Sequence, residues 1–185
     1  DSGAECIMQL WADVNNYTSN DYGYIGYNEA EGDYSPDFIP EQWVVDLYGQ
    51  GDLRFGQFFK YTEVRMPGPS YHNVYILFKF PGNPELKVET SNALTTRQKA
   101  KPFRIAEQYL ILAEAYARSG NTTEARNVLN QLREARYPGY NNEYAEGDIL
   151  SEILNERTRE LIGEGFRLLD LRRFHVDLQR GEAQD

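Results

Sequence analysis

The sequence predicts a mostly α-helical protein in which a loop-rich first half, carrying a few short strands, precedes a helical second half. Three observations support this prediction. Apolar residues recur with a helical period from Pro102 onward, glycines and prolines divide that part into helix-length segments, and six of the eight prolines lie before residue 101. We divide the 185 residues into a loop-rich, acidic, tyrosine-rich region at 1–101, a helical region at 102–178 and a tail at 179–185. This length suits one domain, or part of a larger one.

Two kinds of local signal predict the elements of the first half. Cys6–Leu10 and His72–Phe80 are predicted strands, the second because it is rich in β-branched and aromatic residues. A short helix is predicted at Pro40–Tyr48, since proline favours the first helical position and two glycines follow the segment. The rest of the first half is predicted to be loop, and loops of this length are commonly functional or disordered.

The helical half begins with two helices joined by a short turn. The first helix, Pro102–Ser119, carries apolar residues on more than one side, so we expect it to be covered by other elements. Asn121 and Glu124 form a capping-box-like start for the second helix, which Pro138–Gly139 ends. A third helix is predicted from Asp148 to about Ile162, and a shorter fourth helix at Arg167–Phe174.

The first two helices have the small-residue spacing of a tetratricopeptide helix pair, the unit of an α-α superhelix. Ala113, Ala117 and Ala125 would let the two helices approach closely. Only one such pair is visible, whereas about three stacked repeats are needed to bury a continuous core. The pair is therefore expected to pack on other elements of the chain.

Charge is distributed unevenly along the chain. Residues 1–53 contain 11 Asp and Glu and no Lys or Arg, while the rest holds 19 basic and 18 acidic residues, and the formal net charge is −10. Phosphate contacts need a basic face, so nucleic acid is not an expected partner. A single cysteine, Cys6, excludes an intrachain disulfide, and with two histidines a zinc site would need mostly carboxylates. No apolar stretch is long enough to predict a membrane span.

Glutamates recur every four residues along the third predicted helix. Like charges at this spacing repel, so arginines must compensate them. We interpret the pattern as a structural ionic network, with these predicted members: Arg104, Glu107, Glu114, Glu156, Arg157, Glu160, Glu164, Arg167 and Asp170. The alternative is a carboxylate pair for glycoside hydrolysis, in which two carboxyls face each other across a sugar. Successive turns of one helix point the same way, so we predict no catalytic residues and no enzyme activity.

The tyrosine-rich loop between Asn16 and Tyr34 is the candidate ligand-binding segment. Aromatic rings can stack on the C–H face of a pyranose, while amides and carboxylates bind its hydroxyls. Gly23 and Gly26 would be poor neighbours for rings in a core, because they add backbone freedom without packing area. A packed Ω-loop and a calcium-binding loop stay open as alternatives, and calcium is the one cofactor considered. The predicted glycan-binding residues are Tyr22, Tyr24, Tyr27, Asn20, Asp21 and Asn16.

Two segments of the helical half stand out: RIAEQYLILAEA from Arg104 and ILNERTRELIGEGFRLLDLRRF from Ile153. In this order they resemble the SusD/RagB family of outer-membrane glycan-binding lipoproteins. The resemblance covers about residues 102–174, with weaker markers at Asp52–Arg54 and Lys79–Phe80. Phe174 stands where the family more often has Trp.

This resemblance implies a non-catalytic protein that binds oligo- or polysaccharide at the bacterial cell surface and delivers it to a SusC-like TonB-dependent outer-membrane transporter. The family's lipid-bearing cysteine, N-terminal repeat helices and C-terminal tail have no counterpart here. We therefore expect the C-terminal portion of a longer protein, held at the outer membrane only by a lipid anchor outside this chain. A tetratricopeptide-type protein-interaction module and, third, a carboxylate-dependent glycoside hydrolase stay open as alternative functions.

Overall fold

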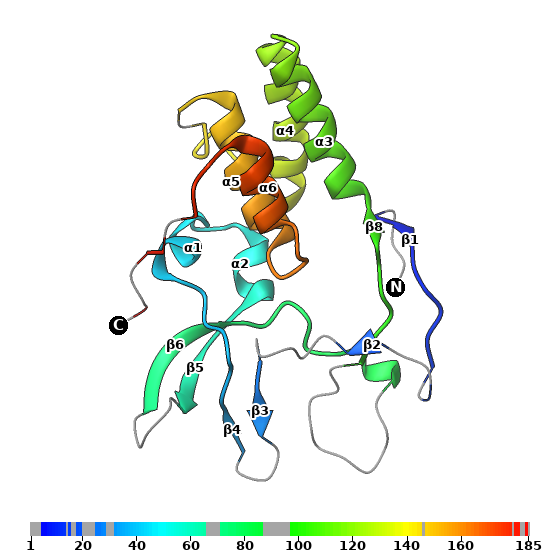
Figure 1. Cartoon of the computed structure of the whole chain (residues 1–185), viewed down its shortest axis with the longest axis vertical. Helices are drawn as coiled ribbons and strands as arrows, with labels where there is room; N and C mark the ends of the chain where they lie inside the picture. Colours follow the sequence, from blue (N-terminus) through cyan, green and yellow to red (C-terminus); the bar gives the residue numbers. More distant parts are fainter. Residues whose placement is uncertain are drawn as a thin grey trace. The chain divides into compact units, whose positions relative to one another are not determined.

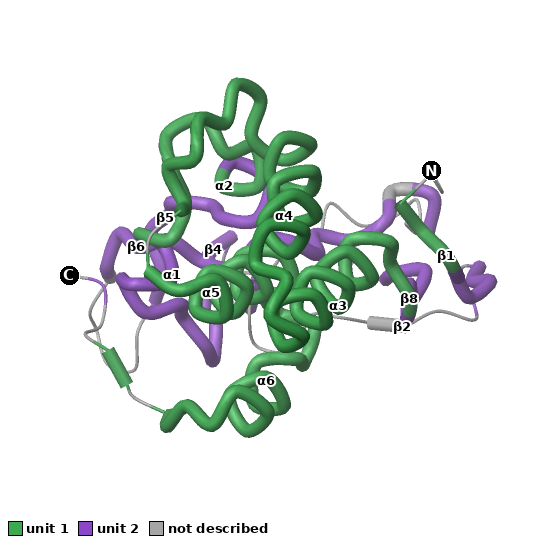
Figure 2. Tube along the Cα trace, turned by 90° about the horizontal axis from the view of Figure 1, so that it is seen from above, with its two compact units in different colours: residues 1–7, 46–55, 103–181 green, residues 8–45, 56–102, 182–185 purple. Residues whose placement is uncertain are grey.

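A computed structural model describes residues 5–13, 15, 18–19, 25–28, 32–65, 71–86, 97–145, 147–178, 180–181 and 184. The fold is mostly helical, as predicted, with the longest helices after residue 104 (Figure 1). Among the described residues, none of the helices combines the length and the apolar character required to cross a membrane. The chain forms two compact units, coloured separately in Figure 2: unit 1 takes in residues 1–7, 46–55 and 103–181, and unit 2 residues 8–45, 56–102 and 182–185.

Unit 1 contains two helices joined by a three-residue turn, α3 (Ile105–Arg118) and α4 (Thr122–Arg136). Gly120 in the turn has φ +85°, a left-handed conformation that costs glycine little. The Asn121 side chain accepts a hydrogen bond from the Glu124 backbone N–H at 3.2 Å, which confirms the predicted cap. The turn and the cap together direct α4 back along α3, and the two helices pack against each other.

Two more helices complete unit 1, α5 (Ile149–Leu161) and α6 (Arg167–Phe174), both close to the predicted bounds. Asp148 caps α5, because its Oδ1 accepts hydrogen bonds from the backbone N–H groups of Leu150 at 2.9 Å and Ser151 at 3.1 Å. Helices α3, α4 and α5 share one apolar core, formed by Ala106, Leu110, Ala113, Ala125, Val128, Leu129, Leu132, Ile149, Ile153 and Leu161. The repeat-like pair thus packs on α5, as expected. The predicted cover on a second side of α3 is not seen among the described residues, since Ile105, Ile111 and Leu112 are exposed.

Unit 2 contains a four-stranded sheet in the order β3-β4-β5-β6. Its strands are β3 (Tyr27–Asn28), β4 (Asp33–Tyr34), β5 (Phe59–Arg65) and β6 (Tyr71–Leu77). The hairpin β5–β6 is antiparallel and β4 runs parallel to β5. Alternate residues of the hairpin face one side of the sheet and bury a small core of Val64, Val74 and Ile76.

A glutamine from the end of the chain bonds to the outer edge of this sheet. Gln184 Oε1 accepts a hydrogen bond from the Tyr75 N–H at 2.6 Å, and its Nε2 donates to the Tyr75 carbonyl at 2.8 Å. The same Nε2 donates to the Pro40 carbonyl at 2.7 Å. One side-chain amide therefore fills the position in which a further strand would pair with Tyr75.

The remaining elements are short. The structure also contains β1 (Cys6–Met8) paired with β8 (Phe103–Arg104), β2 (Thr18–Ser19) paired with β7 (Arg97–Gln98), α1 (Gln42–Asp46), α2 (Leu53–Phe58) and a 3₁₀ turn at Pro84–Leu86. Strand β1 and helix α1 lie within predicted segments. Helix α2 and strand β5 were not predicted, and β6 ends three residues before the predicted strand does.

Replacing Asp148 with Ala should lower the free energy of unfolding by about 1 kcal/mol, because two N–H groups in the first turn of α5 lose their acceptor. Asp148→Asn keeps an acceptor oxygen and should retain most of the stability. Urea denaturation of both variants measures the difference. Equal losses in the two variants would contradict the assignment of Asp148 as a cap.

Candidate functional site

Most predicted glycan-binding residues lie outside the described residues, and for these the prediction stays untested. They are Asn16, Asn20, Asp21, Tyr22 and Tyr24. Tyr27 is described: it lies half-buried in β3, directly opposite Tyr34 of β4. The two ring centroids are 5.0 Å apart and the ring planes are tilted by 52°, an arrangement that aromatic pairs favour. The tyrosine-rich segment therefore contributes one well-defined aromatic pair to unit 2.

A lysine from a neighbouring strand completes this pair. Lys60 Nζ in β5 donates a hydrogen bond to Tyr34 Oη at 2.6 Å and lies 4.5 Å from the centroid of that ring. The same ammonium lies 5.1 Å from the centroid of the Phe78 ring, within the range of a cation–π contact. Sequence reasoning missed Lys60, because it lies 26 residues from Tyr34 and outside the acidic segment.

Gly26 has a backbone reason to be glycine. Its φ is +56°, and a Cβ built on it would lie 2.3 Å from the Ser35 carbonyl oxygen. The Ser35 N–H donates to the Gly26 carbonyl at 2.8 Å, so two chain segments touch at this point. In the sequence, Gly26 indicates that the nearby rings are not packed in a core. That interpretation does not hold, because the close approach of the Ser35 backbone requires a glycine at this position. The adjacent Ile25 is fully buried.

Glu156 of α5 lies at the centre of an arginine–glutamate network in unit 1. Its carboxylate accepts hydrogen bonds from Arg54 Nη1 at 2.6 Å, from Arg133 Nε at 3.1 Å and from Arg159 Nη2 at 2.9 Å. All four side chains are at least 96% buried. The network comprises Glu5, Asp52, Arg54, Arg104, Arg126, Arg133, Arg136, Glu152, Glu156, Arg159, Glu160 and Glu164.

Glu160, one turn further along α5, is bound by a second set of arginines. Arg54 Nη1 donates to it at 3.2 Å, Arg136 Nε at 3.1 Å and Arg104 Nη1 at 3.0 Å. Arg104 also donates to Glu164 at 2.7 Å. The structure thus brings together the predicted members Arg104, Glu156, Glu160 and Glu164, and links them through Arg54, which was not predicted as a member.

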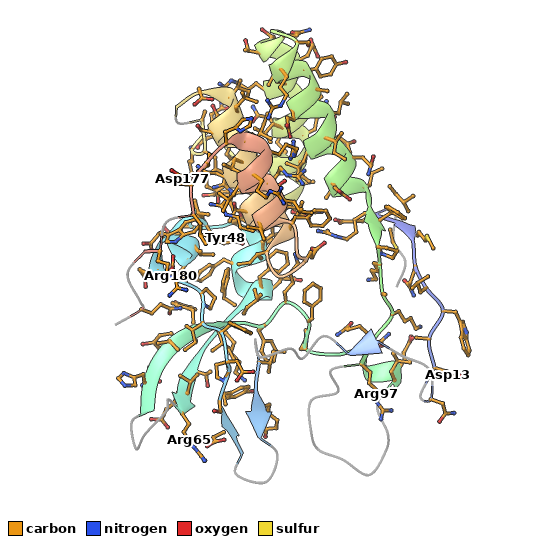
Figure 3. All side chains as sticks on the ribbon, in the orientation of Figure 1. Asp13, Tyr48, Arg65, Arg97, Asp177 and Arg180 are labelled. Carbon is orange, nitrogen blue, oxygen red and sulfur yellow. The ribbon has the colours of Figure 1, made fainter. Side chains whose placement is uncertain are left out.

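Arg54 is positioned by the loop that begins helix α2. Asp52 accepts hydrogen bonds from Arg54 Nε at 2.9 Å and Nη2 at 2.7 Å, a two-pronged pair that fixes the guanidinium plane. Tyr144 Oη donates to Asp52 at 2.9 Å, and Tyr48 Oη (Figure 3) donates to the Arg159 carbonyl at 2.9 Å. One signal could have identified Arg54 in the sequence, since it is the first basic residue after 53 residues without one.

Three further predicted members, Glu114, Arg157 and Asp170, form a second group around α6 together with Arg173. Arg157 Nε donates to Asp170 at 2.8 Å, and Arg173 Nη2 donates to the other oxygen of Asp170 at 2.8 Å. Arg173 also forms an ion pair with Glu114. This group connects α5, α6 and α3 within unit 1.

Two predicted members differ from the expectation. Glu107 makes no ion pair with any described residue, because Arg104 precedes α3 and its guanidinium reaches the carboxylates of α5 instead. Arg167 donates to the Thr158 hydroxyl at 2.8 Å. Burial lowers the pKa of Arg167, and the charge of Asp170 only partly opposes this shift.

The electrostatics of the network keep Glu156 and Glu160 ionised. Burial alone would raise the pKa of Glu156, but the charges of Arg54, Arg159 and Arg133 outweigh it and lower the pKa to about 2. The pKa of Glu160 is lowered in the same way, against its burial, by Arg136, Arg54 and Arg104. A glycosidase needs one carboxylic acid with a raised pKa to protonate the leaving group. This arrangement favours an ionic network over a hydrolytic pair. Among the residues with described positions, no group of His, Cys, Asp or Glu could hold a metal ion.

Comparisons with known proteins place these features in a family context. The sequence profile of the SusD family matches residues 56–185, which include the β5–β6 hairpin and helices α3 to α6. SusD-like protein P38 of Formosa agariphila is 29% identical over 132 residues, which cover 66% of this chain and 25% of that protein.

Solved structures share the fold. A SusD superfamily protein from Bacteroides fragilis matches with a TM-score of 0.66 at 18% identity, covering 93% of this chain and 41% of its own. Surface glycan-binding protein A from Bacteroides thetaiotaomicron matches with a TM-score of 0.63 at 20% identity, covering 92% and 42%. The chain therefore spans a quarter of the curated relative and about two fifths of these solved structures.

Replacing Glu160 with Ala should lower the free energy of unfolding by about 3–5 kcal/mol, since it leaves buried arginines without their partner. Glu107→Ala removes the same charge from a position without an ion pair in the described part of the chain, and should cost at most about 1 kcal/mol. Thermal and urea unfolding of both variants give the comparison. Similar small losses in both would show that the network contributes little to stability.

Stability should also fall in acid through Glu156. Its pKa in the folded chain, about 2, lies below its ordinary value of 4.5, so the stabilisation is fully present above pH 4.5 and is lost as the pH falls toward 2. The loss attributable to this one carboxyl is about 3 kcal/mol. Urea denaturation at a series of pH values measures it in the unmodified chain. A free energy of unfolding that stays constant from pH 5 to pH 2.5 would contradict the lowered pKa.

Proposed function

We propose, starting from the fact that this chain belongs to the SusD family, that it is part of a cell-surface protein that binds glycans without cleaving them. The observation that carries the proposal is the family match over residues 56–185, which spans most of the helical region and the hairpin of unit 2. The ionised, arginine-bound carboxylates of Glu156 and Glu160 agree with a binding role, since neither is poised to donate a proton.

The relatives support the same class of ligand. One solved structure with the same fold is a surface glycan-binding protein. We extend that role to this chain, and with it a location at the outer surface of the cell. Anchoring in the outer membrane by a lipid, and delivery of the glycan to a SusC-like TonB-dependent transporter, are further parts of the proposal that rest on the family resemblance.

We place the sugar contact on the tyrosine-rich segment between Asn16 and Tyr34. Tyr27 and Tyr34 supply two rings with different orientations, and Lys60 fixes the second ring through its hydroxyl. Such a pair can hold the apolar face of a pyranose while neighbouring amides bind its hydroxyls. Tyr22 and Tyr24 are proposed as further stacking platforms, with Asn16, Asn20 and Asp21 as hydrogen-bonding partners.

The proposal is tested first by a glycan array with this chain, followed by calorimetric titration of the best glycan. Tyr22→Ala, Tyr24→Ala and Tyr27→Ala should each weaken binding about fivefold or more, the loss expected for one stacked ring. Tyr61→Ala is the matched control: Tyr61 is 60% exposed and follows Lys60 in β5, so its side chain points to the opposite face of the sheet.

Two results would contradict this assignment. Unchanged affinity in all three loop variants would return these tyrosines to a packing role, as would melting temperatures lowered in the absence of sugar. A chain that binds no glycan, while capturing a protein partner through its helices, would favour the protein-interaction alternative.

A further inference from the structure

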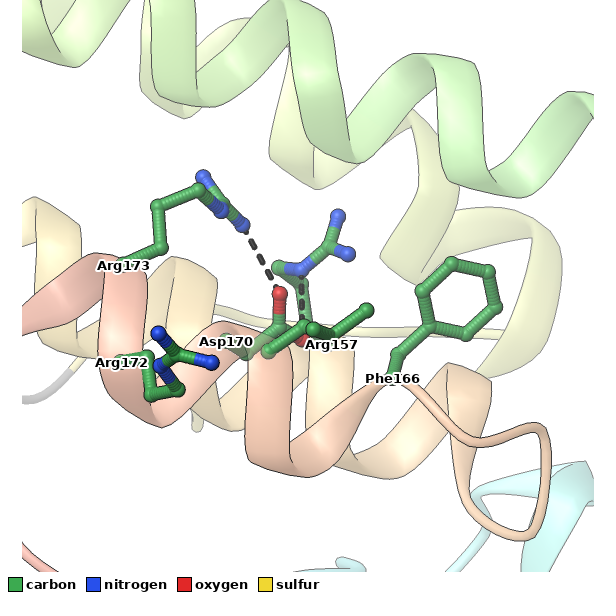
Figure 4. Close-up of a pocket in the computed structure, with 6 residues that line it drawn as sticks. Arg157, Phe166, Asp170, Arg172 and Arg173 are labelled. Atoms are coloured by element: carbon green, nitrogen blue, oxygen red, sulfur yellow. Dashed lines mark hydrogen bonds and ion pairs between the residues drawn. The ribbon is translucent and has the colours of Figure 1, made fainter.

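Helices α5 and α6 border an open cavity of about 540 Å³ in unit 1. Figure 4 shows the residues that line it: Arg157, Phe166, Leu169, Asp170, Arg172 and Arg173. All six belong to unit 1. We propose that this cavity, the Arg157 cavity, binds the carboxylate of an acidic saccharide, and the choice of a saccharide rests on the glycan-binding function proposed above.

The first argument is an unsatisfied donor. Arg157 is 96% buried and uses its Nε to bind Asp170, but its Nη1 has no hydrogen-bond partner among the described residues. In Figure 4 its guanidinium extends into the space between Arg173 and the Phe166 ring. A buried N–H without an acceptor is unfavourable and uncommon in folded proteins. An oxyanion entering here would supply the missing acceptor.

The second argument is the balance of charge. The cavity lining holds three arginines and one carboxylate, although the whole chain carries a formal net charge of −10. That carboxylate, Asp170, is already bound by both Arg157 and Arg173. Arg172 is exposed and forms no ion pair with a described residue. Arg173 is also paired with Glu114, so the uncompensated positive charge at the cavity is that of Arg172, which attracts an anion.

The third argument concerns the shape of the ligand. Guanidinium groups bind carboxylates through two parallel N–H groups, and the exposed Arg172 can present such a pair beside the unpartnered Nη1 of Arg157. Leu169, which is 59% exposed, and the Phe166 ring line the same cavity and offer apolar surface for the C–H face of a sugar ring. A uronic acid combines both features in one residue, with a carboxylate attached to a pyranose.

The experiment compares trigalacturonic acid with its methyl ester, which keeps the sugar and removes the charge. Calorimetric titration should show the acid binding at least tenfold more tightly than the ester. Arg172→Gln should remove most of that preference, and Arg157→Lys should reduce it because the lysine ammonium cannot present the planar, parallel N–H groups of a guanidinium. Arg180→Gln is the control, because it removes one exposed positive charge from a residue that does not line the cavity. Figure 3 labels Arg180.

The outcomes separate this inference from the proposed function. Equal binding of acid and ester, or an acid preference that Arg172→Gln and Arg180→Gln change equally, would overturn the anion site and leave glycan binding intact. Binding of neutral glycans on the array without binding of the acid would overturn it as well. Loss of all glycan binding would overturn the proposed function and this inference with it. Arg172→Gln decides the question even where Arg157→Lys fails to fold.

Discussion

The salt bridge between Arg54 and Glu156 joins two parts of the chain that are 102 residues apart, and both side chains are withdrawn from water. Removing such charges from solvent is costly, and only complete pairing offsets the cost. Each partner is accordingly saturated: Arg54 also binds Asp52 and Glu160, and Glu156 also binds two other arginines. The network therefore demands that the α2 loop, α4 and α5 take up one arrangement within unit 1, because any other arrangement would strand a buried charge.

The helices of the second half could be predicted closely because their signals are local. Asn121 and Asp148 mark the starts of α4 and α5 through hydrogen bonds to residues two or three positions away. Strand β5 has no such local marker. Its residues alternate in the order FKYTEVR, but a strand is stabilised by the strand beside it, and β5 pairs with β6 over seven residues. The pairing of β5 with β6 cannot be predicted from the sequence of β5 alone.

The ionic network was predicted in part for the same reason. The spacing of Glu156 and Glu160 shows that cations must surround them. Arg159 binds Glu156 from three residues away, but most of the other partners come from distant segments of the chain. Arg133 binds Glu156 from α4, where it follows Leu132 on the apolar side of the helix and is fully buried. An arginine beside the apolar residues of a predicted helix could have indicated that Arg133 belongs to a buried ion pair. For the tyrosine-rich segment, the prediction can be compared with the structure mainly at Tyr27, because most of the candidate residues lie outside the described part of the chain.

The hydrogen bonds of Gln184 to Tyr75 have a consequence for how the chain behaves in solution. β6 is the outer strand of its sheet, and an unpaired outer strand is a template on which other chains can add by strand pairing. A side-chain amide presents one donor and one acceptor with the spacing of a peptide group, but it cannot extend into a second strand. Gln184 thus occupies the position on this template at Tyr75, so another chain could pair with β6 there only after displacing it.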